Sequence, residues 1–203
     1  MNQRDRQLNG KLYNVYEVDE NWIQARKLCR KFNDSLFWED TTALDELKKI
    51  FKSVGTNFVL TPPFYCDHGT KISFGNYFYA NIGLTILDEN EVKIGNHVFI
   101  GPHVSIYTAA HPIDSSIRNT NLEIAKPVTI GDNVWIGGNT VINPGVTIGN
   151  DVVIGSGSVV TKDIPNRVIA VGNPCRVLRE ITKKDEEYWN QQYFDYRNDK
   201  DIK

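Results

Sequence analysis

The sequence lacks a long apolar run, and it has almost no excess of charge of either sign. Its 203 residues include 23 Lys and Arg against 25 Asp and Glu, a net charge of −2. A basic groove for nucleic acid or a patch for an anionic membrane is therefore not expected. No stretch approaches the length of a transmembrane helix, and the charged N-terminus leads into no apolar segment of a signal peptide. These absences predict a cytoplasmic protein with no nucleic-acid or membrane partner.

Cysteine is also scarce in this sequence. Cys29, Cys66 and Cys175 are an odd number, and their spacing is not that of a metal site. The count favours free thiols in a reducing compartment over a disulfide framework.

Helical periodicity is confined to the two ends of the chain. Residues 21–32 place apolar side chains three and four positions apart, and a second helix is expected over 41–53, ending at Gly55. The charged and aromatic tail, 182–203, is expected to form a short helix, with a frayed terminus as the alternative. The side chains expected to pack from that helix are Tyr188, Trp189 and Tyr193.

A six-residue repeat runs from about residue 71 to residue 171. Six blocks from Val128 read VTIGDN, VWIGGN, TVINPG, VTIGND, VVIGSG and SVVTKD, and three from Val92 read VKIGNH, VFIGPH and VSIYTA. An aliphatic or small residue begins each block, and an aliphatic residue occupies its third position. A helix has a period of 3.6 residues and an antiparallel strand a period of two, so neither fits the blocks. The segment 87–91 interrupts the count.

Short strands bent around a triangular prism do fit the repeat. Three blocks then make one turn, and stacked turns bury an aliphatic column that no single turn could bury alone. We predict a β-helix over residues 56–181, preceded by a helical segment over 1–55 and followed by the tail over 182–203. Residues 107–127 are polar and lack the repeat, so they are expected to protrude as a loop, where functional residues are often found.

The repeat region resembles the maltose and galactoside O-acetyltransferases. The resemblance is carried by KPVTIGDNVWIGGNTVINPGVTIGNDVVIGSGSVVTKDIP and VGNPCRVLREI, and by FYCDHGTKI, FYANIGLTILD and YTAAHPID. It extends from about Gly10 to Ile181. It implies a mainly-β fold, a left-handed parallel β-helix, although crossover connections are usually right-handed. It also implies acetyl-CoA as cosubstrate with no metal, and a homotrimer with active sites between neighbouring subunits.

The resemblance assigns the two catalytic roles to His111 and Asn81. Acetyl transfer to a hydroxyl requires a base, and a His with a pKa near neutrality can take the proton and later protonate the leaving thiolate. The family's catalytic histidine matches His111, which precedes Pro112 in the protruding loop. Asn81 matches the donor that stabilises the oxyanion of the thioester carbonyl. The implied reaction is direct attack, without a protein nucleophile.

The resemblance also implies residues for the two substrates. Carboxylates suit a sugar, because each can accept hydrogen bonds from two neighbouring hydroxyls. The positions implied for the acceptor are Asp67, Asp88, Glu89 and Tyr79. The positions implied for coenzyme A are Trp135, Gly138, Ser156, Thr161, Lys162, Arg176 and Arg179.

Two positions depart from the family pattern. An acceptor-contacting Asp of the relatives is Val15 here, and an Arg of their first helix is Trp22. Glu17 or Asp19 could supply the lost acid only if the local chain is shifted. The coenzyme half of the expected site is therefore better defined than the acceptor half.

Three other functions are compatible with the scaffold. The same enzyme could acetylate an antibiotic alcohol or an amino-sugar, or the β-helix could bind ligands without catalysis. A zinc hydratase would need clustered His ligands, but His97 and His103 are six residues apart and are expected on different faces of the prism. His68 is expected to line the acceptor side or to be exposed.

Overall fold

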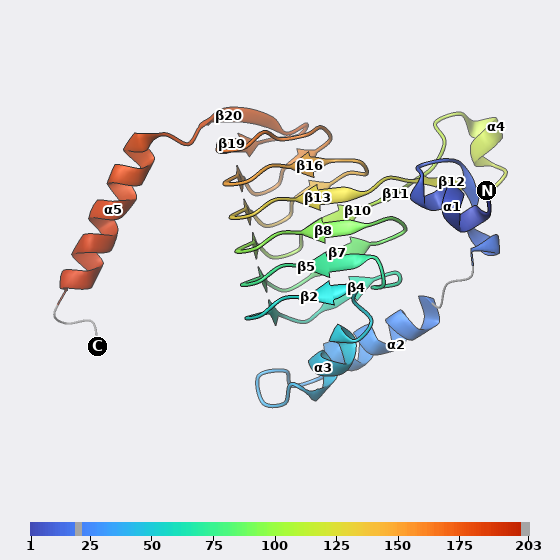
Figure 1. Cartoon of the computed structure of the whole chain (residues 1–203), viewed down its shortest axis with the longest axis horizontal. Coiled ribbons are helices and arrows are strands. Elements are labelled where there is room, and N and C mark those ends of the chain that lie inside the picture. Colours follow the sequence, from blue (N-terminus) through green and yellow to red (C-terminus); the bar gives the residue numbers. More distant parts are fainter. Residues whose placement is uncertain (19–21, 200–203) are drawn as a thin grey trace.

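The computed structural model describes residues 1–18 and 22–199, and most of them form a three-sided parallel β-helix (Figure 1). The first side contains β2 (Ser53–Val54), β5 (Ile72–Phe74), β8 (Val92–Ile94), β13 (Val128–Ile130) and β16 (Thr147–Ile148). The second contains β3 (Val59–Leu60), β6 (Tyr79–Ala80), β9 (Phe99–Ile100), β14 (Trp135–Ile136), β17 (Val153–Ile154), β19 (Val168–Val171) and β20 (Arg176–Glu180). The third contains β4 (Phe64–Cys66), β7 (Leu84–Leu87), β10 (Ser105–Tyr107), β15 (Val141–Ile142) and β18 (Val159–Val160). The predicted parallel β-helix is confirmed.

The register of the sheets follows the six-residue repeat. Thr129 of β13 pairs with Thr147 of β16, three blocks later. In the early turns Ser53 pairs with Ser73, which is two residues more than three blocks. The interruption of the count at 87–91 therefore reflects a longer turn and leaves the pairing of the strands intact.

Glycine and asparagine stack at the edge between the first and second sides. A Cβ on Gly75 would lie 2.5 Å from the carbonyl carbon of Gly95 in the next turn, so no larger residue fits there. The residue after each glycine links the turns: the Asn76 N–H donates to Asn96 Oδ1 (2.9 Å), and the Asn96 N–H donates to Asp132 Oδ1 (2.7 Å). The same bond from a backbone N–H to an asparagine Oδ1 recurs from Thr56 to Asn76, from Asp132 to Asn150 and from Asn150 to Asn166.

The inward side chains form one aliphatic column that widens into an aromatic cluster in the first turn. The rings of this cluster are Phe51, Phe58, Phe64, Phe74 and Phe78. Helices α2 (Trp22–Asn33) and α3 (Thr42–Lys48) cover this end of the prism and bury Phe32 and Leu47 (Figure 1). Burial of each such side chain contributes roughly 1.5–3 kcal/mol to the stability of the fold. The two helices thus keep the end of the core from water.

The two predicted N-terminal helices are present with different bounds. Helix α2 begins at Trp22, and Asn21 lies outside the described residues. Helix α3 ends at Lys48 instead of Ser53, because the following residues join the first sheet, where the Lys52 N–H donates to the Ile72 carbonyl (2.9 Å).

Residues 107–127 leave the prism between β10 and β13. The segment is more regular than the predicted loop, because β11 (Ala109–Ala110) and β12 (Leu122–Ala125) form an antiparallel pair with α4 (Ser115–Arg118) at its tip. Strand β1 (Tyr13–Asn14) pairs with the other edge of β12. The short helices α1 (Gln3–Leu8) and η1 (Val15–Glu17) flank β1. The N-terminus is therefore anchored to the protruding segment (Figure 1).

The C-terminal tail forms α5 (Lys183–Asn198), which begins with a capping box between Thr182 and Asp185 and extends away from the prism (Figure 1). The predicted packing does not occur within this chain, since Tyr188, Trp189 and Tyr193 are 58%, 66% and 61% exposed. Within residues 1–18 and 22–199, no helix combines the length and the apolar character needed to cross a bilayer.

We expect Gly75→Ala to lower the free energy of unfolding by about 3 kcal/mol, the upper end for an overpacked site, because the contacting atoms are backbone. Urea titration followed by circular dichroism measures this. Gly157→Ala is the control: its Cβ would meet nothing within 4 Å, so only the positive φ of 72° costs stability, about 1 kcal/mol. Equal losses in the two variants would show that the turns do not need glycine at this edge.

Candidate active site

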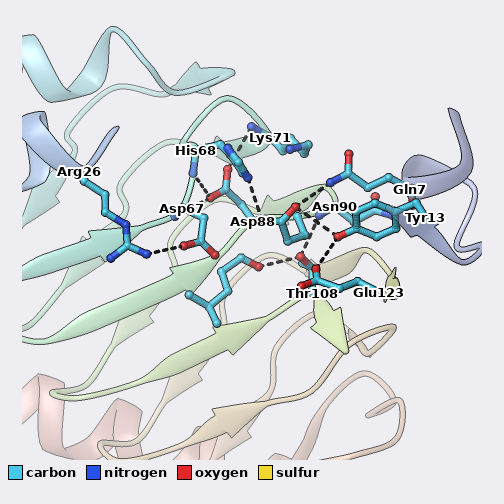
Figure 2. Close-up of polar contacts among 12 residues, drawn as sticks. Gln7, Tyr13, Arg26, Asp67, His68, Lys71, Asp88, Asn90, Thr108 and Glu123 are labelled. Carbon is cyan, nitrogen blue, oxygen red and sulfur yellow. Dashed lines mark hydrogen bonds and ion pairs between the residues drawn. The ribbon is translucent and has the colours of Figure 1, made fainter. Parts of the chain in front are cut away.

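Three segments that interrupt the repeat lie one above another at the edge between the third and first sides, which we call the site edge. They are residues 67–71 after β4, 88–91 after β7 and 108–127 after β10. Asn90 joins the second and third of these segments to the N-terminus. Its backbone N–H donates to the Thr108 hydroxyl (2.9 Å), and its side-chain amide donates to the Gln7 (3.0 Å) and Ala125 (3.1 Å) carbonyls (Figure 2).

Asp88 is fully buried at the site edge and orients the segment before it. Its Oδ1 accepts hydrogen bonds from the N–H groups of Asp67 (3.1 Å) and His68 (2.9 Å). Burial raises the pKa of Asp88 to about 6, and the hydrogen bond from His68 and the charge of Lys71 limit the rise. Asp88 is inaccessible in this chain, so of the two adjacent carboxylates it is Glu89 that lines the cavity described below.

Glu89 is held by residues that are far apart in the sequence. Its carboxylate accepts from Gln7 Nε2 (2.7 Å), and it lies 2.9 Å from His68 Nε2 and 3.3 Å from the Tyr13 hydroxyl. The Tyr13 hydroxyl also lies 2.9 Å from Glu123 Oε2 (Figure 2). Burial raises the pKa of Tyr13, and the charge of Glu89 raises it further, so this phenol stays protonated as a donor.

A cavity of about 430 Å³ opens beside these carboxylates. Its walls are Val15, Tyr16, Val18, Trp22, Arg26, Asp67, His68 and Glu89. Arg26 pairs with Asp67 (3.2 Å), and its guanidinium lies 5.8 Å from the centre of the Trp22 ring. Burial raises the pKa of Asp67 and the charge of Glu89 adds to the rise, whereas His68 and Arg26 oppose it. The cavity thus presents an aromatic ring, a cation and two carboxylates to a ligand.

His111 lines a second cavity of about 420 Å³ on the protruding segment. Its other walls are Val15, Tyr16, Arg118, Asn119, Asn121 and Glu123. Val15 and Tyr16 line both cavities, so the turn η1 is the wall that they share. Val15 therefore stands beside the predicted base. Glu17 lies on the same turn, where it pairs with the side chains of Gln3 and Asn14, while Asp19 lies outside the described residues.

Three further predicted site residues lie on the second side of the prism: the catalytic Asn81, the acceptor position Tyr79 and the coenzyme position Trp135. Tyr79 lies in β6, Asn81 directly follows that strand, and Trp135 lies on β14. Among the described residues, none of these three lines either cavity at the site edge. Asn81 Oδ1 accepts a hydrogen bond from the Ile82 N–H (2.8 Å), which directs its amide nitrogen away from its own backbone.

The predicted coenzyme positions lie toward the C-terminal end of the prism. A Cβ on Gly137 would lie 2.5 Å from the Ser156 nitrogen, and a Cβ on Gly138 would lie 3.0 Å from the Pro102 carbonyl oxygen, so adjacent turns approach closely around Gly138 and Ser156. Thr161, Lys162 and Arg176 are exposed. Arg179 is engaged by helix α5 through two hydrogen bonds to Asp185 (2.7 and 2.8 Å), which hold the pKa of that carboxyl low.

Among the site residues that the sequence does not predict are Gln7, Tyr13, Arg26 and Glu123. Arg26 could have been found, because it follows Trp22 by four residues and so lies on the same helix face. The contacts of the other three depend on how the N-terminus and the protruding segment meet, and no local pattern encodes them.

The histidines outside the site occupy two different edges, as predicted. His97 stacks on Tyr77 (ring centroids 4.5 Å apart), whereas His103 lies against Gly83. In the part of the chain that the structure describes, no group of three His, Cys, Asp or Glu could hold a metal ion.

Two family models match the chain. The bacterial transferase hexapeptide model (six repeats) matches residues 127–162, and the maltose acetyltransferase hexapeptide capping motif matches residues 6–55. The first match falls on the later turns of the prism, and the second covers the N-terminal segment up to β2.

Curated relatives and solved structures cover most of the chain. A putative acetyltransferase of Saccharomyces cerevisiae is 47% identical over 89% of this chain and 94% of its own, and the galactoside O-acetyltransferase of Escherichia coli is 42% identical over 87% of each. A maltose O-acetyltransferase from Clostridium difficile 630 superposes with a TM-score of 0.86 (46% identity; 90% and 98% covered). A galactoside acetyltransferase in complex with coenzyme A superposes with a TM-score of 0.85 at 41% identity, and the match covers 92% of this chain and 94% of the other.

The buried carboxyl of Asp88 makes stability depend on pH. Its folded pKa of about 6 exceeds the ordinary 3.8, so the folded protein keeps a proton that the unfolded chain has already released. Stability should therefore fall as the pH rises from about 4 to 6 and level off above, by up to about 3 kcal/mol. Urea unfolding of wild type and Asp88→Asn across this range measures the difference, with the exposed Asp34→Asn as control. A constant difference between wild type and Asp88→Asn would contradict the raised pKa.

Proposed function

The chain belongs to the hexapeptide-repeat acetyltransferases with the maltose acetyltransferase capping motif, and from that membership we propose that it transfers the acetyl group of acetyl-CoA to a hydroxyl of a sugar. Acetyl-CoA is the donor, and similar structures hold coenzyme A or acetyl-CoA. The acceptor half of the proposal is carried by one observation, the cavity that collects Arg26, Asp67 and Glu89 beside Trp22.

The cavity has the chemistry of a sugar site. Its volume of about 430 Å³ lies within the usual range of about 300–1,000 Å³ for small-ligand sites. Asp67 and Glu89 can accept bonds from neighbouring hydroxyls, and the half-exposed Trp22 ring offers an apolar surface to the C–H face of a sugar. Arg26, which pairs with Asp67, supplies one helical turn later the cation that the family resemblance implies at the position of Trp22.

His111 is proposed to act as the general base. It removes the proton from the acceptor hydroxyl as that oxygen attacks the thioester carbonyl carbon, and it then returns the proton to the departing thiolate. Asn81 donates its amide N–H to the oxyanion that forms on the carbonyl. This role suits Asn81, because the Ile82 N–H already occupies its side-chain oxygen (2.8 Å).

We further propose a homotrimer in which one subunit's His111 faces the Asn81 side of its neighbour. The outer face of the second sheet carries an apolar ladder in register, Val59, Tyr79, Phe99 and Trp135, which are 43%, 36%, 52% and 57% exposed. Such a continuous apolar stripe is typical of an interface. Asn81 directly follows β6, which carries Tyr79 of this ladder, so a neighbour that covers the ladder would lie beside Asn81.

Coenzyme A is proposed to lie along the later turns of the prism. Gly138 and Ser156 leave the backbone open to a pantetheine arm, with Trp135 beside the acetyl group, and Thr161 offers a hydroxyl. Lys162 and Arg176 are exposed cations for the phosphates. Arg179 would add a third cation only after its bonds to Asp185 are released.

An acceptor other than a neutral sugar, such as an amino-sugar or an antibiotic alcohol, is the second candidate. Val15 favours it, because an apolar side chain replaces an acceptor-binding acid on the wall between the two cavities. A panel of sugars, amino-sugars and antibiotic alcohols with acetyl-CoA, followed by thiol release, distinguishes the two. Coenzyme binding without turnover on any acceptor would instead indicate a binding protein.

His111→Ala is expected to lower kcat by a factor of roughly one hundred or more, because the acceptor hydroxyl loses its base. Release of the coenzyme A thiol measures the rate. His97→Ala is the matched control, since His97 lies at another edge of the prism. Undiminished turnover in the His111 variant would exclude this residue as the base.

Arg26→Ala is expected to raise the KM of the acceptor about tenfold while the KM of acetyl-CoA stays unchanged, because a charged hydrogen bond in the cavity is lost. Arg30→Ala, one turn further along α2, is the control, since Arg30 pairs only weakly with the exposed Asp34 (3.6 Å). A parallel rise in both KM values would place Arg26 outside the acceptor site.

A further inference from the structure

Two of the three cysteines lie in contact, although 37 residues separate them in the sequence. Cys29 of α2 and Cys66 of β4 have their sulfur atoms 3.7 Å apart. Both side chains are buried, with exposed fractions of 3% and 4%. The spacing of the three cysteines in the sequence predicts free thiols and does not indicate this contact.

The sulfur pair borders a cavity that the proposed reaction does not use. This cavity, of about 500 Å³, is lined by both cysteines, by Arg26 and other residues of α2, β4 and β7, and by Asp67. A small oxidant can therefore reach sulfurs that are otherwise covered. Cys175 lies in the last turns of the prism, far along the chain from this cavity, and is an internal reference.

We propose that Cys29 and Cys66 form a reversible disulfide that links helix α2 to the β-helix beside the acceptor cavity. The bond requires the sulfurs to approach from 3.7 Å to about 2.05 Å. Helix α2 packs directly on β4, so the two elements are already adjacent and only a small displacement of the helix is needed.

A peroxide is the class of oxidant that fits the buried pair. The hydrogen bond between the two sulfurs lowers the pKa of Cys29 against the effect of burial, and Arg26, whose charge also lowers it, lines the same cavity. We therefore assign the first attack to Cys29, reacting as its thiolate. Its sulfur attacks one peroxide oxygen, forms a sulfenic acid and releases hydroxide. The Cys66 sulfur then attacks the sulfenic sulfur, and its proton leaves with the departing hydroxide as water. Two thiols thereby lose two electrons, and hydrogen peroxide becomes two waters.

The disulfide would act on the acceptor cavity through its neighbours in the chain. Arg26 precedes Cys29 by one helical turn, and Asp67 directly follows Cys66, so the Arg26–Asp67 ion pair (3.2 Å) spans the same contact between α2 and β4. A displacement of α2 changes the geometry of this pair and hence the binding of the acceptor. This consequence rests on the proposed function, whereas formation of the disulfide does not.

The full-length protein is treated with hydrogen peroxide and mapped by mass spectrometry without reduction. We expect a mass loss of two hydrogen atoms per chain, a crosslinked peptide pair containing Cys29 and Cys66, and full reversal by dithiothreitol. Cys175→Ala should retain the crosslink, and Cys29→Ala and Cys66→Ala should each abolish it. Sulfinic or sulfonic acid on Cys29 without a crosslink, or a crosslink that involves Cys175, would overturn the proposal.

Kinetics test the coupling to the acceptor cavity separately. The oxidised protein should show at least a threefold change in the KM of the acceptor, reversed by dithiothreitol and absent in Cys29→Ala, with the KM of acetyl-CoA unchanged. A crosslink with unchanged acceptor KM would overturn the coupling. If no acceptor is acetylated at all, the proposed function fails, and the peptide map still decides whether the disulfide forms.

Discussion

The close approach of successive turns at the Gly–Asn edge is the constraint on which the rest of the fold depends. Backbone atoms of Gly75 and Gly95 leave no room for a Cβ. The residue after each glycine donates its backbone N–H to a side-chain oxygen of the next turn, as Asn76 does to Asn96 and Asn96 to Asp132. Because every turn repeats this arrangement, the pitch of the prism is fixed at that edge. The aliphatic column can then be filled by whichever inward residue the repeat supplies.

The site arises where the repeat is relaxed. Extra residues at the site edge leave the strands in register, but they bring polar groups out of the column to a place where the N-terminus can reach them. The bond from Gln7 to Glu89 and the pairing of β1 with β12 join three distant parts of the chain. The turns of the prism on one side and the N-terminal segment on the other therefore hold the carboxylates of the proposed acceptor cavity in place.

The β-helix could be predicted because each block carries its own inward residues and its own corner. The site could be predicted only in part. The resemblance pointed to Asp67 and Glu89, which do line the cavity, but the support from Gln7 depends on a contact across 82 residues. The charged and aromatic composition of the C-terminal tail predicted a helix, but it does not tell whether the aromatic side chains of that helix pack against the same chain, and in this structure they are exposed.

The unequal length of the turns at one edge has a consequence for how such a protein can change. At two edges the connections between strands have nearly the same length in every turn. At the third edge they range from the short segment 88–91 to the long segment 108–127, and the strands on either side stay paired. An insertion there alters the ligand-facing surface without disturbing the stack. The scaffold therefore offers a grafting position, and new acceptor preferences can evolve or be engineered at this edge as exchangeable parts.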